Sequence, residues 1–151
     1  MISDGEPVPG WLRELADAAG KMEINPLAQP PVRGGRASAV LVLFGGGPDD
    51  PDLLFIPRTG FRVVPVLAWW RQPGAVAPVD PAEVAAVERV TVGELVDPAT
   101  RVMVRGPGGF LSPAFRVKGM LIWGFTAVLV DRLLALGGWE RPWDNARVID
   151  L

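Results

Sequence analysis

The 151-residue sequence contains no cysteine, no histidine and no tyrosine. Without cysteine, the chain cannot form disulfide bonds, thiolate zinc sites or a cysteine nucleophile. Without histidine, imidazole cannot serve as a general base, general acid or metal ligand, and a Ser-His-Asp triad cannot form. Acid–base chemistry would therefore depend on Asp, Glu, Lys or water, and a metal site would use carboxylates, which favour Mg²⁺, Mn²⁺ or Ca²⁺.

Strong charge of one sign and long apolar segments are also missing. Fifteen Lys and Arg residues oppose 17 Asp and Glu residues, so the net charge of −2 provides no basic surface for nucleic acid. The longest uncharged apolar stretch, 119–130, is too short to cross a bilayer. The first ten residues lack the basic and apolar regions of a signal peptide. We therefore expect a cytoplasmic protein with neither a nucleic-acid partner nor a membrane partner.

What is present is typical of one globular domain spanning 1–151, with 49% hydrophobic and 21% charged residues. Residues 1–35 are expected to form an N-terminal helix and a linker. The helix is predicted at 11–19, where apolar residues recur at the helical spacing, and Gly20 is expected to end it in the left-handed conformation. Residues 25–36 are rich in Pro and Gly, which favours a surface crossing.

Three strands are predicted next. The continuous apolar run 37–44 indicates a strand that is buried on both faces and flanked by strands on both sides. A short apolar run follows at 53–56, and another strand is predicted at 60–70. Pro65 cannot donate to a ladder, so this last strand should lie at an edge or carry a bulge. Trp69 and Trp70 are adjacent and should point to opposite faces, one of them into the core.

The second half alternates short elements. Asp80 to Glu83 and Thr91 to Glu94 both have the spacing of a helix N-terminal capping box. Residues 101–105 alternate and 106–109 form a Gly-rich turn, so 101–105 and 110–117 should pair as a hairpin.

The longest helix is predicted at 118–136. Its expected apolar stripe consists of Leu121, Ile122, Phe125, Val128, Leu129, Leu133 and Leu136, and Gly137-Gly138 should end it. Residues 139–151 should form an irregular tail held to the body by Trp139 and Trp143.

Five of these segments, in this order, resemble the Nudix hydrolases, and specifically the bacterial coenzyme A diphosphatases. The similar stretches are WLRELADAA, RASAVLVLF with GPDDPDLL, FIPRTGFRVVPVLAWW, DPAEVAAVERVTVGELVDP and RVKGMLIWGFTAVLVDRLL. The resemblance implies an α/β fold in which helices lie on both sides of a mixed β-sheet. It also implies cleavage of the diphosphate of coenzyme A or acyl-coenzyme A with Mg²⁺ or Mn²⁺.

The sequence departs from this family at its defining motif. The family pattern G-x5-E-x7-R-E-U-x-E-E-x-G-U, where U is aliphatic, belongs between 53–54 and 55–60. Here those flanks are joined directly, and no Glu-Glu pair occurs anywhere in the chain. Metal-bound water and charge neutralisation drive such hydrolysis, so we assign no catalytic and no metal-binding residue. The sandwich should also lack the layer formed by the catalytic helix.

Four residues remain as candidate substrate contacts through the resemblance: Glu83, Arg58, Trp123 and Thr126. Each has a simpler interpretation, namely a helix cap for Glu83, a solvated cation for Arg58, and core packing for Trp123 and Thr126. The acids at 49, 50 and 52 could hold a cation weakly, but a solvated turn is the favoured interpretation.

Three hypotheses for function follow. The first is an inherited coenzyme A diphosphatase, expected to be inactive in this chain. The second is a non-catalytic relative that binds a coenzyme A-like nucleotide or a protein. The third is the product of a damaged or wrongly read Nudix gene. Loss of a helical layer would expose sheet faces and edges, so the sequence also allows a homodimer.

Overall fold

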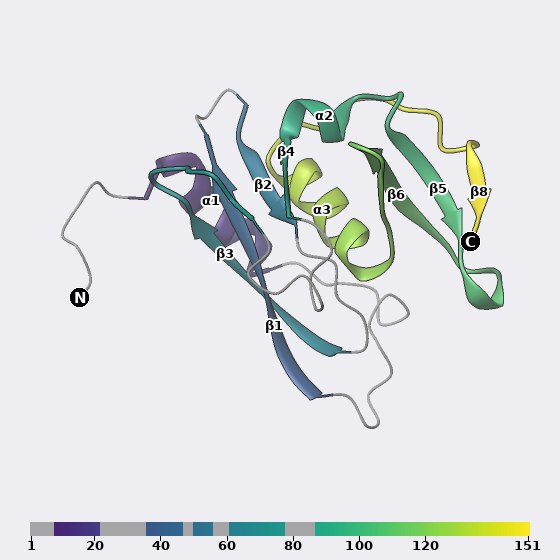
Figure 1. Cartoon of the computed structure of the whole chain (residues 1–151), viewed down its shortest axis with the longest axis horizontal. Helices are drawn as coiled ribbons and strands as arrows, with labels where there is room; N and C mark the ends of the chain where they lie inside the picture. Colours follow the sequence, from purple (N-terminus) through teal and green to yellow (C-terminus); the bar gives the residue numbers. More distant parts are fainter. Residues whose placement is uncertain (1–7, 22–35, 47–49, 56–60, 78–86) are drawn as a thin grey trace.

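The computed structural model describes residues 8–21, 36–46, 50–55, 61–77 and 87–151. These residues form a mixed α/β fold with two four-stranded sheets and three α-helices (Figure 1). The elements in chain order are α1 (Gly10–Ala19), β1 (Arg36–Gly45), β2 (Asp52–Phe55), β3 (Phe61–Trp69), β4 (Glu88–Thr91), α2 (Val92–Val96), β5 (Arg101–Arg105), the 3₁₀ turn η2 (Pro107–Gly109), β6 (Leu111–Val117), β7 (Met120–Ile122), α3 (Gly124–Leu136) and β8 (Val148–Asp150).

The first sheet has the strand order β3-β1-β2-β4. Strand β1 pairs in parallel with β3 and antiparallel with β2, which confirms the prediction that residues 37–44 form an interior strand. β4 extends the sheet beyond β2, with Leu53 opposite Val90. Val42, Phe44, Leu53 and Val90 are buried on one face of this sheet.

The proline in β3 lies where the prediction placed it, on an edge strand. Trp70 N–H donates to the carbonyl of Phe44 in β1 at 2.6 Å, so even-numbered residues of β3 direct their N–H groups toward β1. Pro65, an odd-numbered residue, therefore has its missing donor on the free edge of β3. The ladder between β1 and β3 consequently continues across the proline, with Val40 opposite Pro65.

The order of the strands requires the chain to cross β1. β2 lies on one side of β1 and β3 lies on the other, and only residues 56–60 separate Phe55 from Phe61. β2 runs antiparallel to β1 and β3 runs parallel to it, so β2 and β3 are antiparallel to each other. This short crossing is the point at which the resemblance places the missing block.

The second sheet has the order β7-β6-β5-β8. The predicted hairpin is confirmed, because β5 and β6 pair antiparallel with Arg101 opposite Phe115. The expectation of an irregular tail at 139–151 is wrong at its end, since β8 joins the sheet in parallel with β5. β8 has only three residues, two apolar and one acidic, which is too short a stretch for an alternating pattern to predict a strand.

Helix α3 begins later than predicted. Residues 120–122 form β7 and pair with β6, because Lys118 and Gly119 adopt positive φ values of 49° and 76° in a tight turn. Gly137 and Gly138 follow the helix as expected, whereas Gly20 after α1 is right-handed, contrary to prediction. Leu136, expected in the apolar stripe, is exposed.

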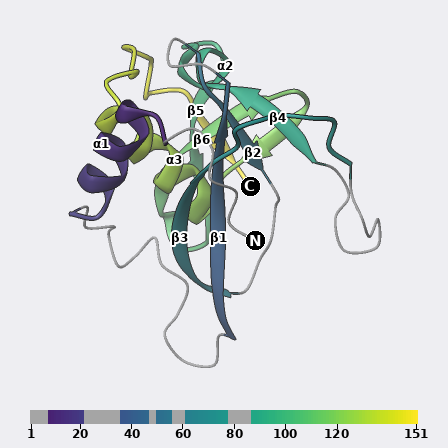
Figure 2. The same ribbon diagram turned by 90° about the vertical axis from the view of Figure 1, so that its left-hand side faces the viewer.

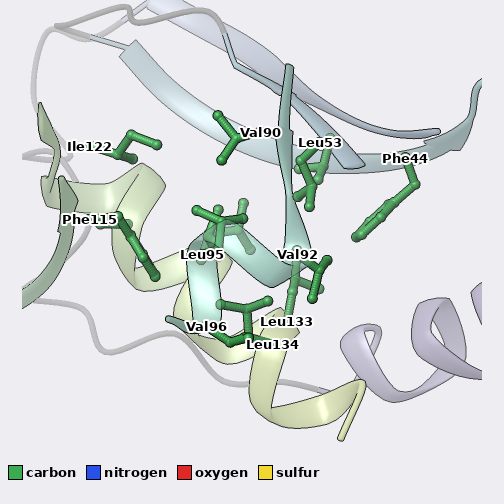
Figure 3. Close-up of a cluster of buried hydrophobic side chains, with 14 of the residues drawn as sticks. Phe44, Leu53, Val90, Val92, Leu95, Val96, Phe115, Ile122, Leu133 and Leu134 are labelled. Atoms are coloured by element: carbon green, nitrogen blue, oxygen red, sulfur yellow. The ribbon is translucent and has the colours of Figure 1, made fainter. Parts of the chain in front are cut away.

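One hydrophobic core joins the three helices to both sheets (Figure 3). The buried side chains of α3 are Ala127, Leu129, Val130, Leu133 and Leu134. They belong to the same cluster as Leu12 and Leu15 of α1, so α1 and α3 cover the same face of the first sheet (Figure 2). No described helix covers the opposite face of that sheet.

Aromatic rings link both ends of the chain to this core. Trp11 makes edge-to-face contacts with Phe44, Trp69 and Trp139, with ring centroids 5.7–5.9 Å apart. Trp139 therefore holds the tail to α1 and β1, as predicted. Within the described parts of the chain, no helix has the length and apolar character needed to cross a membrane.

Candidate functional site

Two of the four candidate substrate contacts lie together at the start of α3. Trp123 immediately precedes the helix in an extended conformation, and Thr126 lies in the first turn. The side chain of Trp123 is 45% exposed, so the expectation that it packs in the core is wrong. Thr126 is half-buried. Among the residues that the structure describes, no side chain caps this end of the helix, where N–H groups without helical partners create a positive potential.

The other two candidates, Glu83 and Arg58, fall outside the described residues, as do Asp49 and the helix start expected at Asp80. The structure therefore brings Trp123 and Thr126 together and does not place their two companions. An exposed indole beside free N–H groups has the chemistry to stack on a planar ring and to hydrogen-bond an anionic group.

Two of the three acids expected to form a solvated turn, Asp50 and Asp52, have protein partners. Asp52 is buried, with 7% exposure, and pairs with Arg89 across β2 and β4. Asp50 is exposed and accepts a 2.8 Å hydrogen bond from the N–H of Gly93 at the start of α2. Both carboxylates are therefore structural, and a divalent ion would have to displace an arginine or a backbone donor to bind them.

A charged and aromatic cluster surrounds this pair. The guanidinium of Arg89 lies 5.3 Å from the ring centroid of Trp70, which places Trp70 on the face opposite the core-packed Trp69. Lys118 donates to the backbone carbonyl of Arg89 and lies 3.6 Å from a carboxylate oxygen of Glu94.

Glu94 also completes the predicted capping box. Its carboxylate accepts from the N–H of Thr91, and the hydroxyl of Thr91 accepts from the N–H of Glu94. The carboxylate of Glu94 therefore interacts both with the N-terminus of α2 and with Lys118. Asp50, Asp52 and Glu94 therefore each accept a hydrogen bond from a protein donor.

Sequence reasoning missed a buried ion pair between β5 and α3. Arg101 is 1% exposed and donates to the carboxylate of Asp131. Its guanidinium lies between the rings of Phe115 and Trp143, at 4.9 and 4.4 Å from their centroids. Burial raises the pKa of Asp131, and the positive charge of Arg101 opposes that shift. Trp143 therefore holds the tail in place, as predicted, through a cation–π contact.

This arrangement gives no site suited to Mg²⁺ or Mn²⁺ in the described part of the chain. No group of three Asp or Glu residues there could share an ion. The nearest pair of acids, Asp50 and Asp52, is already bonded to protein donors. The metals that the resemblance implies therefore stay a prediction.

Comparison with known proteins adds no relative. A scan against protein-family models and a search of the curated proteins both found no match to this chain.

Proposed function

We propose that this chain is a Nudix-like domain, similar to coenzyme A diphosphatases, that does not hydrolyse coenzyme A. The observation that carries the proposal is that only residues 56–60 separate β2 from β3 in the sequence, while the two strands lie on opposite sides of β1. The resemblance places the ion-binding glutamates of the family in a block at this position, and the sequence contains no Glu-Glu pair. The Nudix-like form of the α/β fold, the metal dependence and the cytoplasmic location stay predictions.

The engagement of the neighbouring acids supports the loss of activity. A replacement site would need carboxylates free to hold ions and activate water. Asp50, Asp52 and Glu94 instead cap α2 or neutralise basic side chains. Removing both metal activation of water and charge neutralisation should lower the rate by many orders of magnitude.

A hydrolysis assay tests this proposal. The purified chain, with its intact mass verified, is incubated with coenzyme A while Mg²⁺ and Mn²⁺ are titrated, and release of adenosine 3′,5′-diphosphate is measured. We expect no metal-dependent turnover above the protein-free control. Turnover that follows metal concentration would show that the present residues assemble a site, and the proposal would fail.

A graft gives the complementary test. Residues 56–60 are replaced by a block that carries the complete family pattern, and the matched control carries the same block with its adjacent glutamates changed to glutamine. We expect metal-dependent hydrolysis from the first graft and none from the second. Rereading the coding DNA at this junction separates a real deletion from an error in the sequence.

The second candidate function is binding without catalysis, and the exposure of Trp123 favours it. An indole that is not used in the core and lies beside Thr126 can contact a coenzyme A-like ligand. Calorimetric titration with coenzyme A should show binding that Trp123→Ala weakens. Phe110→Ala, which removes another exposed aromatic ring on the distant hairpin, is the matched control and should bind as the parent does.

A further inference from the structure

Exposed apolar side chains gather at one end of the second sheet. Four of the seven large hydrophobic residues exposed in the described chain lie there: Phe110, Leu111, Val148 and Leu151. Leu111 is opposite Arg105 in the hairpin, and the N–H of Leu151 donates to the carbonyl of Arg105. Apolar groups that cluster in this way mark interaction surfaces more often than isolated ones do.

The same end carries an unpaired strand edge. β8 is the outermost strand of its sheet (Figure 1). Arg147 and Leu151 flank β8 and direct their backbone groups toward β5. The carbonyl of Arg147 accepts from the N–H of Met103 at 2.8 Å, and the N–H of Leu151 donates to the carbonyl of Arg105 at 3.3 Å. Because successive residues of a strand alternate, the N–H and C=O groups of Val148 and Asp150 point away from β5. Each of these residues therefore offers one donor and one acceptor on the free edge.

The other described edges are less suited to pairing. The free edge of β3 lacks a donor at Pro65, and β4 carries the charged residues Glu88 and Arg89. β7 has no exposed apolar side chain. Natural proteins use proline and charge in this way to prevent strands from adding to an edge. β8 combines a free edge with exposed apolar neighbours.

We propose that a second copy of this chain pairs with β8, antiparallel and about a two-fold axis through Ile149. A two-fold axis makes one surface its own complement, so no other partner is needed to satisfy the edge. Val148 then lies opposite Asp150 of the second copy, and four backbone hydrogen bonds form. The two sheets become one sheet of eight strands.

Side-chain packing supports this register. Ile149 packs against a small cluster formed by the buried residues Val102, Val104 and Ala114, separate from the main core. In the two-fold arrangement, Ile149 meets its own equivalent at the close spacing of a non-hydrogen-bonded pair. The small cluster then continues across the interface. Asp150 keeps its ion pair with Arg105, so its charge is not left without a partner.

The interface is small and the dimer should be weak. Stable interfaces bury at least about 1,200 Å² in total, which a three-residue strand and its neighbours do not reach. We therefore expect reversible association in the range of about 10 µM to about 1 mM. This inference is independent of the proposed function, because no residue of β8 belongs to the candidate substrate contacts.

A pair of charge variants tests the register. Val148→Asp places a like charge opposite Asp150 of the second copy, and Val148→Lys places an opposite charge there. Cross-strand charge pairs have modest energies, but symmetry repeats the contact twice. We expect sedimentation equilibrium to show a dissociation constant about fivefold higher for Val148→Asp and about fivefold lower for Val148→Lys. Circular dichroism should show that both variants melt as the parent does, because position 148 is exposed.

Hydrogen exchange on the unmodified chain gives a second measurement. The amide protons of Val148 and Asp150 should exchange more slowly as protein concentration rises, while that of Leu129 in α3 stays unchanged. A parent chain that is monomeric at about 1 mM would overturn the proposal. A dimer that both variants weaken equally, or that neither variant affects, would also overturn it, because the contact would then lie elsewhere.

Discussion

Phe44→Ala should remove the centre of the aromatic contacts that join α1, β1 and the tail. The side chain of Phe44 is 1% exposed and belongs to β1, an interior strand of its sheet. Its ring centroid lies 5.7 Å from that of Trp11 and 6.4 Å from that of Trp139. Truncating a buried phenylalanine costs about 3–5 kcal/mol, and this range includes transfer and cavity terms. Because two aromatic contacts are lost as well, we expect about 4 kcal/mol or more.

Urea denaturation followed by circular dichroism measures this loss, and a thermal melt should fall by roughly 8–16 °C for a chain of this length. Phe110→Ala is the matched control, because it removes the same side chain from an exposed hairpin position. The control should change the free energy of unfolding by less than about 0.5 kcal/mol. If the two variants unfolded at the same urea concentration, the aromatic core described here would be wrong.

Two further predictions concern single side chains. Thr91→Ala should lower the free energy of unfolding by about 1 kcal/mol in urea titrations, because it removes the cap of α2, whereas Thr126→Ala removes no capping bond and should cost less. Asp131→Asn tests the raised pKa: the folded chain holds this proton more tightly than the unfolded chain, so the carboxyl lowers stability as the pH rises above its ordinary pKa of 3.8. The parent should therefore lose stability relative to Asp131→Asn as the pH rises above 3.8, and a difference that is constant or runs the other way would contradict the burial of this acid.

Local patterns in the sequence predicted the elements that local physics determines. The run 37–44 is apolar on both faces and forms β1, and the capping box at Thr91 and Glu94 forms as its spacing requires. The hairpin of β5 and β6 follows from alternation around a Gly-rich turn. In each case, the interactions that decide the structure involve residues close together in the sequence.

Contacts between distant segments were not predictable in this way. The pairing of β8 with β5 joins residues that are 45 positions apart, as the bond between Arg105 and Asp150 shows. A charged residue such as Arg101 would be expected at an exposed strand position. Its burial is compensated by Asp131 of α3, by Phe115 of β6 and by Trp143 of the tail. Residues 120–122 suit a helix and a strand equally, and pairing with β6 decides between them.

The candidate site shows the same limit. Trp123 and Thr126 lie together because they are three positions apart at a helix start, a relation that the sequence itself contains. The exposure of Trp123 depends instead on the path of the chain between the end of β7 and the start of α3. The sequence alone predicted that Trp123 packs in the core. The partners of Asp50 and Asp52 come from α2 and β4, about 40 residues away, so their structural roles could not be read from the acidic turn alone.

The position of Pro65 bears on how this protein tolerates high concentration. β3 is a nine-residue strand at the edge of its sheet, and its free edge would otherwise present an uninterrupted row of backbone donors and acceptors. Such edges template aggregation, and the proline removes one donor near the middle without disturbing the ladder to β1. Pro65 therefore acts as a gatekeeper residue against fibril growth. A Pro65→Val chain should precipitate at a lower protein concentration than the parent chain.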